Sequence, residues 1–179
     1  MQTLLRKSLF VAGLALGAAV IGQNASGQNT DAGSGDTVHW QSVIGIVQAN
    51  NVVGSGTGAV TGAPGPWSAL DGHVNVDLTR GKIDFYVRGL VLAGGNAIGT
   101  PGTVLQVKGT LVCDTDGSAS VGKNSVLVDT PLVELSDEGD ARFSGNVGQL
   151  PPVCTSESDI AFLIRVGAGK WIANGTVLR

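Results

Sequence analysis

The stretch DGHVNVDLTRGKIDFYVRGLVL, residues 71–92, decides the fold because it specifies a β-hairpin. Apolar and polar residues alternate on both sides of Arg80-Gly81, which is the pattern of strands with one buried and one exposed face. With Arg80 and Gly81 as a two-residue loop, each apolar residue meets an apolar partner: Leu78 with Ile83, Val76 with Phe85, and Val74 with Val87. A loop over 79–82 keeps this parity, whereas a slip of one residue would turn the apolar row to water.

This register makes predictions about individual side chains. Phe85 lies mid-strand on the apolar parity, so we expect it at the centre of the core. Tyr86 lies on the opposite parity and is expected on the exposed face. Asp77 and Asp84 come to face each other on that exposed side, where a like-charge pair costs from a few tenths to about 1 kcal/mol. A neighbouring basic side chain or a bound cation would relieve this repulsion.

The N-terminal residues have the pattern of an export signal. Arg6 and Lys7 precede an apolar run over 9–21, and small residues follow at 25–27. A run of about thirteen residues is shorter than the roughly 20 that a transmembrane helix needs, and the pattern is typical of a secretory signal peptide. We therefore expect three segments: a signal peptide over 1–27, a flexible polar leader over 28–36, and a single all-β domain over 37–179. The expected location is secreted or periplasmic, with no transmembrane helix in the mature chain.

Further alternating or apolar stretches predict the remaining strands. They cover 37–49, a short segment near residue 60, 103–114, 125–130, 140–147, 160–166 and 170–178. Apolar residues on both parities favour an inner strand over 37–49 and a central strand over 160–166. Pro131 is expected to bend or break a strand at a sheet edge.

The connections are expected to be irregular. Glycine and proline make 50–68 the least ordered part by composition and predict a long loop around the short strand near residue 60, and residues 150–153 are expected to form an extended link. No eleven-residue window of the mature chain supports an amphipathic helix. The predicted fold class is therefore all-β, an antiparallel β-sandwich or a small closed β-barrel of about eight or nine strands.

Charge limits the expected partners. Without Arg6 and Lys7, nine basic residues remain against fourteen acidic ones, a net charge of −5. A negative chain without runs of like charge is a poor partner for nucleic acid or for an anionic membrane surface. The sequence leaves the ligand, the partner and the oligomeric state open.

Cys113 and Cys154 are the only cysteines of the chain. In a chain addressed to an oxidising compartment, two cysteines predict one disulfide. Such a bond would close a loop of some forty residues, for which the chain-entropy model gives about 4 kcal/mol. A reactive thiol or a pair of metal ligands would need closer spacing or a neighbouring histidine.

Candidate catalytic residues are few. His39 and His73 are the only histidines, both mid-strand on the polar parity, and no GxSxG, HxH or HExxH motif accompanies them. We therefore predict no catalytic residue and no cofactor.

The segment Asp114-Thr115-Asp116-Gly117-Ser118 is the best hint of a metal site. In short calcium-binding loops, alternating carboxylates followed by a glycine coordinate the Ca²⁺ ion. The third acidic position and the distal glutamate are missing, and an Asp-Gly turn between two strands explains the same residues. We therefore predict no metal site and no structural role for calcium.

From Gly72 to Leu90 the pattern G-x-V-x-V-D, glycine turn, I-x-F-x-V-x-G-L resembles strands of the CHRD family. This resemblance implies a secreted, antiparallel β domain. The whole chain resembles small exported bacterial all-β proteins, and this likeness implies no activity. No functional residue is transferred from either resemblance.

The expected function is a non-enzymatic binding or structural role with an unknown ligand, because folding accounts for the strands and loops. One alternative is an enzyme with an unrecognised site. The other is a small outer-membrane β-barrel, for which an aromatic content of 4% leaves few residues to build two interfacial girdles.

Overall fold

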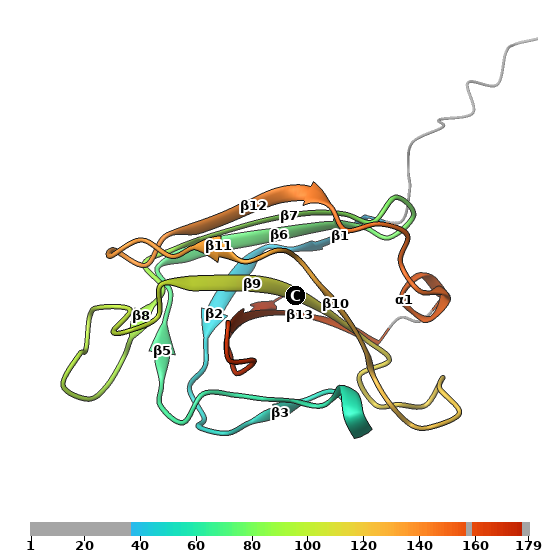
Figure 1. The fold of residues 1–179 in the computed structure, drawn as a ribbon, viewed down its shortest axis with the longest axis horizontal. Helices are drawn as coiled ribbons and strands as arrows, with labels where there is room; N and C mark the ends of the chain where they lie inside the picture. The colour runs from blue at the N-terminus through green and yellow to red at the C-terminus, as the bar shows by residue number, and fades with distance from the viewer. Residues whose placement is uncertain (1–36, 157–158, 177–179) are drawn as a thin grey trace, which may run out of the picture. The chain divides into compact units, whose positions relative to one another are not determined.

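Two antiparallel β-sheets face each other across one hydrophobic core (Figure 1). The computed structural model describes residues 37–156 and 159–176, so the predicted signal peptide and leader lie outside the described residues. Sheet A has the strand order β1 (Thr37–Trp40), β6 (Asp71–Asp77), β7 (Lys82–Arg88) and β12 (Ala141–Asn146). Sheet B has the order β10 (Val126–Asp129), β9 (Gln106–Cys113), β13 (Ile160–Val166), β14 (Trp171–Thr176) and β2 (Ser42–Gly45), with β11 (Val133–Glu134) also paired to β9. Within the described residues neither sheet closes on itself, so the all-β prediction is confirmed with the sandwich as its architecture.

Shorter elements complete the fold. Two small pairs join β3 (Val52–Val53) with β4 (Val60–Thr61), and β5 (Trp67–Ser68) with β8 (Val91–Leu92). The 3-10 helix η1 (Gly56–Gly58) lies between β3 and β4, and α1 covers Pro152–Ser156. Of these four short strands, the sequence predicts only the one near residue 60, because a two-residue strand is too short to show a period of two. The helix α1 corrects the predicted extended link, and its first residue is a proline, whose fixed φ suits a first helical turn.

The hairpin of β6 and β7 confirms the predicted parity and corrects the predicted pairing. Val74, Phe85 and Val87 are buried, and side chains of the other parity are partly or fully exposed. The pairing is shifted by two residues, so Val74 lies opposite Phe85 and Val76 opposite Ile83. A shift by two keeps every side chain on its face, which is why burial alone does not determine it.

Asp77 determines the longer turn. Its carboxylate Oδ1 accepts the backbone N–H groups of Thr79 (3.0 Å) and Arg80 (2.8 Å), and its carbonyl accepts the N–H of Gly81 (2.8 Å). Gly81 adopts φ +67°, which glycine tolerates without a steric penalty. The backbone hydrogen bond from Arg80, followed by that residue's side chain and charge, holds the pKa of Asp77 below its usual value.

The predicted clash between Asp77 and Asp84 was therefore wrong. Asp77 lies opposite Lys82, and Asp84 lies opposite Asn75. A four-residue loop over 78–81 replaces the two-residue loop, because the Asp77 side chain caps the turn. No bound cation is needed to offset repulsion between carboxylates on this face of the hairpin.

The predicted inner strand over 37–49 is two edge strands. β1 lies at the edge of sheet A, and β2 lies at the edge of sheet B. The chain passes from one sheet to the other at Gln41, so the buried parity changes from Trp40 to Val43. Apolar residues on both parities mark this crossover, not an inner position.

The other predicted strands are confirmed with small changes of their bounds. β13 coincides with the predicted central strand and lies between β9 and β14. Pro131 separates β10 from β11, and both of these strands pair with the same edge of β9. The predicted break at an edge is therefore confirmed.

Aromatic rings fill the space between the sheets. Phe85 of sheet A lies 5.7 Å from Phe162 of sheet B, between ring centroids, and 6.1 Å from Phe143. A Cβ atom at Gly109 would lie 2.5 Å from the Phe162 ring and 2.9 Å from the Phe85 ring. Both rings therefore pack directly on the β9 backbone, and no larger residue fits at position 109 without displacing them.

The glycine-rich segment 47–66 packs against sheet B, on the side away from sheet A (Figure 1). The carbonyl of Ser55 accepts the N–H of Ser125 (3.0 Å), and the Ser55 N–H donates to Ser125 Oγ (2.7 Å). The indole N–H of Trp171 donates to the carbonyl of Asn51 (3.0 Å). β4 confirms the predicted short strand near residue 60 within a long loop. The loop is nevertheless fixed by these contacts with distant residues, which are not visible in its composition.

Candidate functional site

The outer face of sheet A carries both histidines and the single tyrosine of the chain. The paired strands arrange its side chains in three rows: His39, Asn75, Asp84 and Ser144; His73, Tyr86 and Arg142; Thr37, Asp77, Lys82 and Asn146. We call these residues the polar face. They occupy the parity opposite to the buried core residues, so the strand alternation that builds the core also exposes them.

Side chains of the polar face contact one another across the strands. His39 Nδ1 lies 2.5 Å from Asn75 Oδ1, and His73 Nε2 lies 3.8 Å from Asp84 Oδ1. The rings of His73 and Tyr86 lie 5.8 Å apart, between centroids. The side chains of His73 and Asp84 are 50% and 40% exposed, so a ligand can reach them without a change in the fold.

The surface is hollowed between the first two rows. A depression of about 420 Å³ is lined by His73, Asp84, Phe85, Tyr86, Arg142, Phe143 and Ser144. Tyr86 and Arg142 also border a second depression of about 400 Å³, which reaches Glu134 and Asp140. Both depressions have the volume of small-ligand sites.

The polar face lacks the arrangement of a nucleophilic catalyst. Among the described residues, His39 bonds to Asn75 and His73 pairs with Asp84, and neither histidine bonds to a serine. The described ranges also contain no group of three or more His, Cys, Asp or Glu side chains placed to hold a metal ion. The arrangement is suited to hydrogen bonding and ring stacking.

The sequence places most of these residues on one exposed parity but does not assemble them. His73, Asn75, Asp84 and Tyr86 follow from the hairpin alone. Arg142 and Ser144 join them because β12 pairs with β7, placing Arg142 opposite Tyr86. The matching alternation over 140–147 is the signal that favours this pairing, although it does not determine the partner strand.

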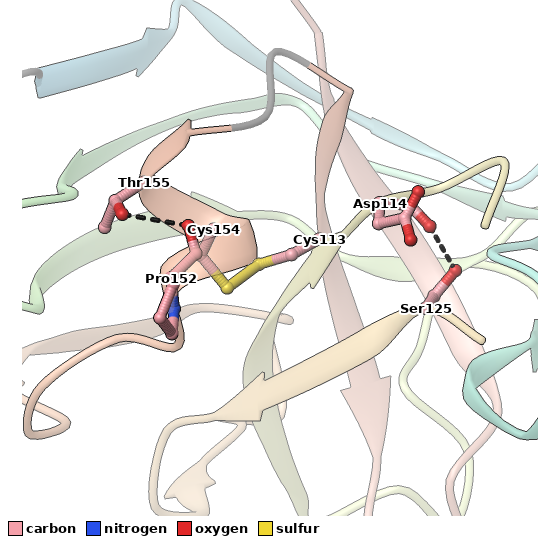
Figure 2. The surroundings of a disulfide bond; sticks show 6 residues. All are labelled: Cys113, Asp114, Ser125, Pro152, Cys154 and Thr155. Carbon is pink, nitrogen blue, oxygen red and sulfur yellow. Dashed lines mark hydrogen bonds between the residues drawn. A yellow bond between two sulfur atoms is a disulfide. The ribbon is translucent and has the colours of Figure 1, made fainter. Parts of the chain in front are cut away.

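The disulfide between Cys113 and Cys154 is present as predicted (Figure 2). Both cysteines are fully buried, and Cys113 shares the core parity of Leu111. The bond joins the end of β9 to α1, with a Cα–Cα separation of 5.0 Å. It holds together two segments that are 41 residues apart in the sequence.

The two aspartates of the calcium hint lie directly after this disulfide. Asp114 is fully buried and adopts φ +56°, whereas Asp116 is exposed. The Asp114 carbonyl accepts the hydroxyl of Ser125 (2.7 Å; Figure 2). The backbone N–H of Ser118, followed by its side chain, holds the pKa of Asp116 below its usual value.

A second group of charged side chains lies on sheet B. Asp129 forms ion pairs with Lys108 and with Arg165 (3.3 Å), and it accepts the hydroxyl of Thr110 (2.6 Å). Partial burial alone raises the pKa of Asp129, but hydrogen bonds from Lys108 and Thr110 and the charges of Lys108 and Arg165 outweigh it. The pKa of Asp129 is therefore lowered.

The lowered pKa of Asp129 predicts a loss of stability in acid. A lowered pKa in the folded state stabilises the protein above the unfolded pKa, near 3.8, and this contribution is lost as the pH falls through the folded value. Asp129→Asn should therefore cost about 1 kcal/mol at pH 7, since the side chain is 37% exposed and solvent screens the pairs. The difference from the wild type should be smaller at about pH 3, below the unfolded pKa, than at pH 7, because protonation removes the charge that the pairs stabilise. Urea unfolding at both pH values checks this, with Asp137→Asn as control, and an equal difference at both pH values would contradict it.

Comparison of the chain with known proteins identified no relatives. No family model matches the chain, and no curated protein and no solved structure is significantly similar to it. Within the described residues, no helix has the length and apolar character that crossing a membrane requires. Functional inference therefore rests on the polar face and on the loop beside the disulfide.

Proposed function

We propose that this chain is a secreted or periplasmic binding domain without catalytic activity, and that its ligand lies on the polar face. One observation carries the proposal: both histidines and the single tyrosine gather on this face, where none belongs to the buried core. Folding explains an exposed polar face, but it does not explain why these three side chains gather there. Side chains that bind ligands do so from a rigid scaffold of this kind.

The chemistry of the polar face favours a polyhydroxylated ligand such as a glycan. The Tyr86 ring offers an apolar surface for stacking, while Asn75, Asp84, Ser144 and Arg142 offer donors and acceptors around it. The polar face carries both acidic and basic side chains, Asp77 and Asp84 with Lys82 and Arg142, so it has no single-sign field to attract a highly charged polymer. Nucleic acid is therefore not the expected partner.

The proposed location outside the cytoplasm has its own support. A disulfide forms and persists in oxidising compartments, and this one lies in the core. The N-terminal pattern of Arg6, Lys7 and the apolar run over 9–21 is typical of an export signal.

Binding to a glycan array tests the proposal. The labelled wild-type protein should bind at least one class of neutral glycan, and Tyr86→Ala should weaken that binding at least about tenfold, as expected for an aromatic contact residue. Because Tyr86 is partly exposed, the melting temperature of the Tyr86→Ala variant should stay close to that of the wild type. Lys170→Ala, an exposed change in the turn before β14, should bind as the wild type does. Binding that Tyr86→Ala leaves intact would place the ligand elsewhere, and no binding to any glycan would exclude this ligand class.

A further inference from the structure

Asp114 in the loop between β9 and β10 has a buried carboxylate oxygen without a donor. Its Oδ1 accepts the N–H of Ala119 (3.1 Å), and its Oδ2 has no hydrogen-bond partner among the described residues. The residue is 0% exposed. Burying an ionised oxygen without a partner is unfavourable, so some group must compensate it.

A second carboxylate lies against the first. The pKa of Asp116 is lowered chiefly by the N–H of Ser118, and the Asp114 side chain is among the other groups in hydrogen-bonding contact with it. Asp159 lies at the same loop, because its Oδ2 accepts the N–H of Asp116 (3.1 Å). A hydrogen bond between two carboxyl groups needs a proton on one of them, and two ionised carboxylates at this contact would repel each other unless a cation lay between them.

We propose that a divalent cation of the calcium type binds to this loop through Asp114 Oδ2 and the carboxylate of Asp116. Carboxylate oxygens are hard ligands, and Ca²⁺ accepts an irregular set of oxygens completed by water and carbonyl groups. The sequence favoured the opposite expectation, because the missing donor of Asp114 becomes visible only in the folded chain. This inference is independent of the polar face.

Two carboxylates make a weak site. Because the described ranges contain no group of three or more His, Cys, Asp or Glu side chains placed to hold a metal ion, the affinity should lie in the range of extracellular modules, with a Kd of about 0.1–1 mM. The ion would hold the Asp114 loop in place. The Asp114 carbonyl accepts the Ser125 hydroxyl, which in turn accepts the N–H of Ser55, so the loop also fixes the segment 54–58.

Thermal unfolding of the disulfide-bonded protein tests the proposal, with CaCl2 alone as the probe. About 10 mM CaCl2 should raise the Tm by roughly 3–6 °C, with half of the shift reached at about 1–2 mM, because the stabilisation grows with the logarithm of the calcium concentration. NaCl of equal ionic strength should not reproduce the shift. Asp116→Ala and Asp114→Asn should each lose most of it, and Asp137→Asn, a change at an exposed position in the turn between β11 and β12, should retain it.

Three results would overturn the proposal. The first is a wild-type Tm that calcium raises no further than NaCl does. The second is a calcium shift that Asp116→Ala retains, which would place the ion elsewhere. The third is Asp114→Asn melting above the wild type without calcium, because an amide donating to Asp116 would show that a proton fills this role. Asp116 is exposed, so the Asp116→Ala variant keeps the test decisive if Asp114→Asn fails to fold.

Discussion

Phe85→Ala should lower the free energy of unfolding by about 3–5 kcal/mol, whereas Tyr86→Ala should lower it by about 1 kcal/mol or less. The two residues are neighbours on β7, but they point to opposite faces of sheet A. Phe85 is 1% exposed and packs against Phe143 and Phe162. Truncating it removes a buried ring and leaves a cavity between the two sheets. Tyr86 lies on the polar face, where water replaces the lost ring.

Urea unfolding of both variants in the same background measures this difference. Because Phe85 also packs on the backbone of Gly109, the surrounding rings cannot close the cavity without moving β9. Equal losses for the two variants would contradict the one-sided burial of sheet A. They would mean that the polar face is covered, by a second layer or by a partner subunit, and would remove it as an open binding surface.

The parity of the hairpin was predictable, and its pairing was not. Alternation determines which side chains are buried, and one face of sheet A is buried as expected. The partner of each residue depends on the turn, and here one side chain, Asp77, accepts two backbone N–H groups and lengthens the loop. Turn chemistry of this kind acts over three residues and leaves no trace in the hydrophobic pattern.

The crossover at Gln41 and the packed segment 47–66 were missed for a different reason. Both depend on contacts with distant residues. The crossover follows from the pairing of β1 with β6 and of β2 with β14, and the segment 47–66 bonds to Trp171 and Ser125. A sequence read in windows contains no information on such partners. It therefore interprets a change of sheet as an inner strand, and a glycine-rich segment that packs closely on sheet B as a loose loop.

The candidate sites also depend on contacts between residues that are distant in the sequence. The hairpin predicts that His73, Asp84 and Tyr86 share an exposed face, but Arg142 and Ser144 join them only through the pairing of β12 with β7. For Asp114, the sequence shows two carboxylates and a glycine, which are equally typical of a turn. Only the folded chain shows that one of the carboxylate oxygens is buried with no donor among the residues that the structure describes.

Removal of the disulfide is the last prediction, with an expected loss of about 4 kcal/mol. The bond joins residues 41 apart, and in the chain-entropy model a loop of this length restricts the unfolded chain by about that amount. The double variant Cys113→Ala, Cys154→Ala should therefore be far less stable than the wild type. Alanine is the better replacement, because both positions are fully buried and serine would place hydroxyl groups in the core.

Comparing this variant with the reduced wild type separates the bond from the side chains. If the bond acts by restricting the unfolded state, the reduced wild type should lose about as much free energy of unfolding as the alanine variant, although its thiols still fill the core. A stable reduced protein beside an unstable alanine variant would instead assign the effect to packing. Non-reducing mass analysis of protein purified without reductant should find no free thiol, and two free thiols there would contradict the disulfide itself. Because the bond also holds α1 and the strand after it against the end of β9, its loss should loosen the Asp114 loop first.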